Sequence, residues 1–212
     1  MPEAESAADY LPESRSLTAL AEAAQGCHGC ELFENATQTV FGRGPADSRV
    51  MLVGEQPGDV EDQRGIPFVG PAGKVLLRAL NEVELTPGTV YVTNAVKHFR
   101  WRIDPKGSQR RIHQTPSAGN IRACRPWLTA ELQAVSPALV VLLGATAAKS
   151  VHGPSFKLTE NRGQILSVDL AGQELTTLAT IHPSAVLRAP DRDEALAGLI
   201  DDLRVATAYL AG

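Results

Sequence analysis

Three polar side chains stand at the ends of apolar runs, and their types suit proton transfer and hydrogen bonding to a ligand. They are Glu55, Asn94 and His182, and the runs that precede them predict strands over residues 50–53, 90–93 and 176–180. In an open α/β sheet, the carboxyl ends of the strands line the ligand crevice. We therefore expect a carboxylate, a carboxamide and an imidazole to share one rim. The alternative for Asn94 is an ordinary turn residue.

The segment after Glu55 is irregular. Gln56 and a Pro-Gly turn follow it, and residues 65–73 then contain three glycines and two prolines. Phe68 in this loop has either a packing role or a stacking role against a planar ligand. A phosphate-binding P-loop is excluded, because Phe68 stands where that motif needs its first glycine and Val75 where it needs Ser or Thr.

The cysteines point to metal ligation. Cys27 and Cys30 form a C-x-x-C turn, and Cys124 lies far along the chain. Three cysteines are an odd number for a disulfide framework. No predicted strand leads into the turn, so a redox pair is the least favoured role. A fourth ligand would come from His98 or His28, with His98 the better placed. Three Cys and one His favour zinc over an iron–sulfur cluster, which mostly takes four thiolates.

A strongly basic segment separates the second predicted strand from the third cysteine. Eight Lys or Arg residues occur from Lys97 to Arg125 against one acid, Asp104, and two aromatic residues are interleaved. This pattern favours a phosphate backbone with stackable bases over a merely solvated loop. The connection of roughly twenty residues has no apolar periodicity, and such structureless loops are usually functional. His113 in it is expected as a neutral imidazole, which is nucleophilic and basic.

Composition and periodicity define the frame that positions these residues. The chain has 212 residues, 43% hydrophobic content and a net charge of −4, which predicts a single domain over 1–212 with disorder over 1–15. No apolar run approaches the ~20 residues that cross a bilayer, and no signal peptide is evident, so we expect a cytoplasmic protein. Helices are predicted at 16–25, 71–83, 117–135, 145–151 and from 191, with further strands at 139–144 and 162–168.

With these residues in place, the chain resembles the uracil-DNA glycosylase superfamily. The resemblance rests on GEQPG from residue 54, GIPFVGPAG from residue 65 and HPS from residue 182, which match motifs of its iron–sulfur branch. Within that branch, the RRIH segment and the Lys97-His98 pair are similar to the UdgX type, which becomes covalently attached to uracil-containing DNA. One departure is Gln109, where that type usually has lysine.

The resemblance implies a three-layer αβα sandwich around a central, mainly parallel four-stranded sheet. It also implies a [4Fe-4S] cluster held by Cys27, Cys30, His98 and Cys124, which replaces the preference for zinc.

The implied activity is excision of uracil followed by covalent capture of the sugar. His113, Glu55 and His182 would be catalytic, and the implied substrate contacts are Gln56, Asp59, Phe68, Asn94, Arg110, Arg111 and Ser184. The partner would be uracil-containing DNA, preferably single-stranded, bound by a monomer. Two alternatives stay open: a turnover glycosylase in which His113 only contacts DNA, and a non-catalytic metal-containing nucleic-acid-binding module.

Overall fold

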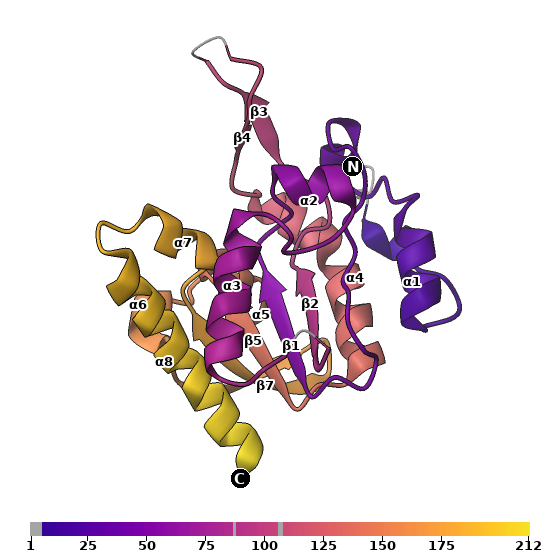
Figure 1. Cartoon of the computed structure of the whole chain (residues 1–212). Coiled ribbons are helices and arrows are strands. Elements are labelled where there is room, and N and C mark those ends of the chain that lie inside the picture. The colour runs from indigo at the N-terminus through magenta and orange to yellow at the C-terminus, as the bar shows by residue number, and fades with distance from the viewer. Residues whose placement is uncertain (1–5, 87, 106–107) are drawn as a thin grey trace.

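The computed structural model describes residues 6–86, 88–105 and 108–212, which form an α/β fold around one sheet (Figure 1). The strand order is β2-β1-β5-β7-β6. The strands are β1 (Val50–Gly54), β2 (Val90–Asn94), β5 (Leu139–Leu143), β7 (Gln173–Thr180) and β6 (Ile165–Leu170). The first four are parallel, and β6 runs antiparallel to β7. The predicted fold class is confirmed, with five strands in place of four.

Helices cover both faces of the sheet, as Figure 1 shows. One face carries α3 (Pro71–Glu82), α7 (Pro183–Arg188) and α8 (Arg192–Ala211), whose leucines pack on β1 and β5. The other face carries α4 (Ala118–Val135) and α5 (Ala145–His152). Both faces of the central strands are buried, which explains their continuous apolar sequences. The short helix α6 (Leu158–Asn161) precedes β6.

The predicted helices occur where capping residues start them. Ser16 caps α1 (Leu17–Ala24), Asp191 caps α8, and Ser117 forms a capping box with Asn120 at the start of α4. The amino-terminal segment, with α1 and the 3-10 helices η1 (Ala7–Tyr10) and η2 (Glu31–Glu34), packs around α4 in a core of its own. Disorder was predicted for residues 1–15. Residues 1–5 lie outside the described part, whereas η1 is ordered.

The prediction of a structureless connection after residue 97 is wrong. Strands β3 (Trp101–Ile103) and β4 (Arg111–His113) pair antiparallel, and the hairpin projects beyond the carboxyl edge of the sheet (Figure 1). Each strand has three residues, which is too short to show an alternating pattern in the sequence. The helix α2 (Asp59–Arg64) also had no signal in the sequence. Among the described residues, no helix is long and apolar enough to span a membrane.

Candidate active site

The centre of the site is a contact between the side chains of Glu55 and His113. Glu55 follows β1 directly, and its Oε1 lies 3.2 Å from Nε2 of His113 at the end of β4. The two side chains are 19% and 47% exposed, so solvent reaches the imidazole more easily than the carboxylate. Thr146, in the first turn of α5, donates a hydrogen bond to the other carboxylate oxygen. Each oxygen of Glu55 therefore has its own partner.

These partners decide the charge of Glu55. Burial raises the pKa of a carboxyl group, but the hydrogen bonds from His113 and Thr146 and the nearby imidazoles together hold the pKa of Glu55 below its ordinary value. The carboxylate is therefore the form present at neutral pH. It can accept a proton from His113 or stabilise a positive charge that develops beside it.

The hairpin that carries His113 is fastened at its base by Gln56. The amide of Gln56 donates to the carbonyl oxygens of Arg100 and Gln114, at 3.2 and 3.1 Å, and accepts from the Arg100 N–H at 3.1 Å. Gln114 N–H also donates to Arg100 O at 2.9 Å. The side chain of Gln56, which was predicted to contact substrate, is therefore already engaged within the protein.

A second attachment is made by Arg111. Its guanidinium pairs with Asp59 and with the fully buried Asp62, and it lies over the rings of Phe99 and Trp101. Although partial burial opposes the charged form, the two carboxylates raise the pKa of Arg111 above its ordinary value. The structure thus gives Asp59 and Arg111 partners inside the protein, whereas Arg110 and Gln109 are exposed on the hairpin.

The side chains of Phe68 and Asn94 close on the backbone of Gly54, the residue before Glu55. A Cβ on Gly54 would stand 2.3 Å from Asn94 Oδ1 and 2.6 Å from Phe68 Cζ, so both side chains converge on this backbone. Phe68 has φ of 55°, a left-handed conformation that is rare for an aromatic residue and that aims its ring at the site. Asn94 is 2% exposed, and its amide has no hydrogen-bond partner among the described side chains and backbone groups.

The backbone of Asn94 is held by a buried ion pair. Lys97 and Glu131 are 1% and 0% exposed and lie 2.5 Å apart. Lys97 Nζ also donates to Asn94 O at 2.7 Å and to Thr93 Oγ1 at 2.6 Å. Lys97 was counted in the basic segment, but it is a core residue that fixes the end of β2. The sequence held no signal for its partner, because Glu131 reads as one polar residue on an amphipathic helix.

His182 enters the same site as the amino-terminal cap of α7. Its ring centroid lies 6.3 Å from that of Phe68, and its Nδ1 accepts the Ser184 N–H at 3.1 Å. Burial lowers the pKa of His182 to about 4, against the opposing charge of Glu55. The ring is therefore neutral at neutral pH, and with Nδ1 an acceptor its proton resides on Nε2, which is free to donate. Ser184 Oγ receives a hydrogen bond from Arg188 and lies 2.8 Å from Nδ1.

The three cysteines lie in one apolar cluster beside α4. Cys27 and Cys124 are buried, Cys30 is half-buried, and all three are free thiols. Trp127 Nε1 donates to Cys27 Sγ and Lys97 N–H to Cys124 Sγ, each at 3.3 Å. N–H donors stabilise a thiolate that ligates iron. The thiols and their donors therefore fit a cluster.

His98 is oriented as a ligand would be. The Thr39 hydroxyl donates its proton to Ala24 O at 2.8 Å, so its oxygen accepts a hydrogen bond from His98 Nε2 at 2.8 Å. With the proton of the His98 ring on Nε2, its lone pair lies on Nδ1. His28, the other candidate, instead stacks on Phe33 with centroids 4.1 Å apart. No group of three or more Cys, His, Asp or Glu in the described residues converges as a single metal ion requires.

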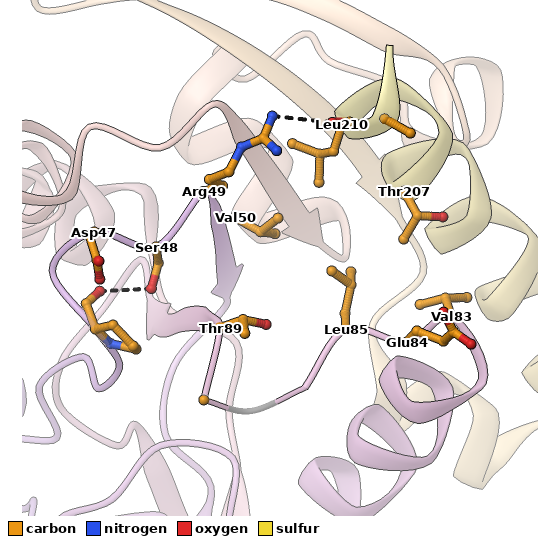
Figure 2. Close-up of a pocket in the computed structure, with 13 residues that line it drawn as sticks. Asp47, Ser48, Arg49, Val50, Val83, Glu84, Leu85, Thr89, Thr207 and Leu210 are labelled. Carbon is orange, nitrogen blue, oxygen red and sulfur yellow. Dashed lines mark hydrogen bonds between the residues drawn. The ribbon is translucent and has the colours of Figure 1, made fainter.

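A pocket of about 480 Å³ lies at the opposite end of the sheet, where β1 begins (Figure 2). Arg49 in its wall donates to Leu210 O at 3.2 Å, as the dashed line shows. None of the predicted site residues lines it. The structure therefore brings Glu55, Phe68, Asn94, His113 and His182 together at the carboxyl edge. It also adds Thr146, for which the sequence gave no signal.

Comparison with known proteins matches the chain to a family profile and to proteins that share one description. The profile of the uracil DNA glycosylase superfamily matches residues 41–204. A type-4 uracil-DNA glycosylase of Pyrobaculum aerophilum is 33% identical over 178 residues, covering 82% of this chain and 86% of that protein. That of Thermotoga maritima is 33% identical over 193 residues, covering 90% and 93%. The Archaeoglobus fulgidus protein of the same description is 30% identical over 183 residues, covering 84% and 87%.

Proposed function

Because the chain belongs to the uracil DNA glycosylase superfamily, we propose that it excises uracil from DNA and that His113 then captures the sugar covalently. The superfamily supports the excision, and the relatives are named for that activity. The observation that carries the capture is the contact of 3.2 Å between His113 Nε2 and Glu55 Oε1, beside the residues that would hold the base.

Recognition requires the uracil nucleotide to leave the base stack, at a cost of a few kcal/mol. Phe68 would stack on the flipped base in the space next to Gly54. The unpartnered amide of Asn94 would then pair with the O4 and N3 edge of uracil. Cytosine has the reversed donor and acceptor pattern at that edge, so the same amide, on a backbone that Lys97 holds, would reject it.

Cleavage transfers the electron pair of the bond between N1 and C1′ to uracil. His182, which is neutral and carries its proton on Nε2, would donate a hydrogen bond to the anionic base. Backbone N–H groups near Gln56 would add to this stabilisation. The sugar is left as an oxocarbenium-like cation, whose charge is offset by the carboxylate of Glu55.

Capture forms a bond between Nε2 of His113 and C1′. Glu55 accepts the Nε2 proton while Nδ1 takes one up from solvent, so the ring stays neutral and the Nε2 lone pair bonds to C1′. Glu55 then gives its proton to the departing uracil anion, and the ring, now an imidazolium, returns the Nδ1 proton to solvent. The balance is one C–N bond broken and one formed, with no redox change. Such a bond has no easy leaving step, so the protein stays attached to the strand.

We also propose that a [4Fe-4S] cluster is held by Cys27, Cys30, His98 and Cys124. Its support is the set of three clustered thiols, the two N–H···S hydrogen bonds and the free Nδ1 of His98. When bound, it would cross-link the amino-terminal segment to β2 and α4. Single-stranded preference and a monomeric state are further proposals, which single- and double-stranded substrates and size-exclusion chromatography would test.

The test is a denaturing gel of the protein incubated with a uracil-containing single strand. Capture gives a slowly migrating adduct, turnover gives abasic DNA without an adduct, and a non-catalytic binding module gives neither. His113→Ala should abolish the adduct while the protein keeps its fold and its visible absorption. An undiminished adduct in that variant would remove His113 from the proposed role.

A further inference from the structure

A second pocket lies on α4, and none of the catalytic residues lines it. It has a volume of about 290 Å³. Arg122, Arg125, Thr129 and Gln133 recur at intervals of three and four residues, so they share one face of the helix. Arg15, from the segment between η1 and α1, closes the other side.

The charged residues that line this pocket are all basic. Arg15, Arg122 and Arg125 contribute three guanidinium groups, and no Asp or Glu lines the pocket. In the part of the chain that the structure describes, none of the three has a hydrogen-bond or ion-pair partner, and Arg125 Nε is buried without one. By contrast, the partly buried Arg111 and Arg162 are paired with aspartates. A buried charged donor without a partner is costly unless a ligand satisfies it.

We propose that this arginine pocket, formed by Arg15, Arg122 and Arg125, binds a backbone phosphate of the DNA strand outside the base cavity. Guanidinium groups present paired donors that match phosphate oxygens. Helix α4 begins five residues after β4 ends at His113, and Arg122 and Arg125 are its fifth and eighth residues. A strand that leaves the site along α4 would therefore reach these arginines within about the first two turns of the helix.

The inference rests on the proposed function in taking DNA as the partner, but its test needs no uracil chemistry. Binding of a uracil-free single strand of 30 nucleotides would be measured by fluorescence anisotropy across a salt series. The double variant Arg122→Gln/Arg125→Gln would be compared with Arg78→Gln/Arg204→Gln. The second pair removes the same charge from exposed positions on α3 and α8.

The pocket variant should bind about tenfold more weakly, and its slope of log affinity against log salt should be shallower by about 0.7 per lost phosphate contact. The control pair should change affinity less than about twofold. Equal weakening in both pairs would overturn the proposal, because it would show a diffuse charge effect. Arg15 lies far from Cys124 in sequence, and Arg15→Gln should also weaken DNA binding. This variant therefore distinguishes loss of the arginine pocket from damage to α4.

A second arm distinguishes the source of the phosphate. Inorganic phosphate at millimolar concentration should shift the melting temperature of the wild-type protein less than the 30-nucleotide strand does. If inorganic phosphate alone stabilises the protein through the pocket and the DNA affinity of the pocket variant is unchanged, the assignment to DNA is wrong. An adduct on uracil-containing DNA is scored separately, so failure of the proposed function is recognised independently.

Discussion

Thr146 is expected to control the rate of covalent capture through the charge of Glu55. Its hydroxyl donates to one carboxylate oxygen while His113 faces the other. Thr146→Val keeps the shape and removes the donor. A hydrogen bond to a charged group contributes about 1.5–3 kcal/mol. Glu55 is 19% exposed, so the lower end of this range applies to its hydrogen bond from Thr146. Because about 1.4 kcal/mol corresponds to a tenfold change in rate, Thr146→Val should slow adduct formation about tenfold.

The sign of the pH effect follows from the same contact. The Thr146 hydroxyl stabilises the carboxylate and lowers the pKa of Glu55. Without it the pKa rises, so a smaller fraction of Glu55 is ionised at any acidic pH. The acid limb of the pH profile for adduct formation should therefore move to higher pH. His182, with a pKa of about 4, becomes protonated at the same acidic end, but Thr146 donates its hydrogen bond to Glu55, so a difference in the limb between the variants reports Glu55.

The assay is single-turnover adduct formation from about pH 3.5 to pH 9, which includes the range below the ordinary pKa of a glutamate, followed on denaturing gels. Thr146→Ser restores a hydroxyl and serves as the matched control, which should return both the rate and the acid limb to wild-type values. If Thr146→Val reacts at the wild-type rate with an unmoved limb, the hydroxyl has no role in setting the charge of Glu55.

Three further variants test other contacts. Gly54→Ala places a Cβ 2.3 Å from Asn94 Oδ1, so uracil excision should fall at least about 100-fold while the protein stays folded. Excision at the wild-type rate in the gel assay would contradict the proposed role of Asn94 and Phe68 in holding the base. Lys97→Met removes the counter-charge of the buried Glu131 carboxylate, which keeps only its hydrogen bonds from Gly42, Tyr91 and Thr93, so the variant should lose about 3–5 kcal/mol in urea unfolding. His98→Ala should destabilise the cluster, and an intact visible absorption spectrum would show that His98 is not the fourth ligand.

Much of the frame could be read from the sequence because its signals are local. Continuous apolar runs mark β1 and β5, which are buried on both faces, and serine or aspartate caps mark the helix starts. The placement of Glu55 and Asn94 on one rim followed from strand ends alone, since parallel strands end at one edge.

The tertiary partners could not be read in this way. Lys97 looked like a DNA-binding cation until Glu131, 34 residues away, proved to be its buried partner. The hairpin was missed because three-residue strands carry no period, and Thr146 was missed because its role depends on a contact 91 residues distant. Side-chain pairing across such distances is set by packing, not by any local pattern.

Glu55 and Gln56 are neighbours, and together they account for how His113 is placed. Beyond β1 the backbone continues its pairing with the β2 side, because Ala95 N–H donates to Gly54 O at 2.9 Å and Val96 N–H to Glu55 O at 3.0 Å. Residues 55 and 56 form a bend after β1, and both side chains reach the hairpin: Glu55 contacts the imidazole of His113, and Gln56 holds the hairpin base. One two-residue segment thus contacts both the imidazole of His113 and the base of the hairpin that carries it, and the proposed capture rests on this arrangement.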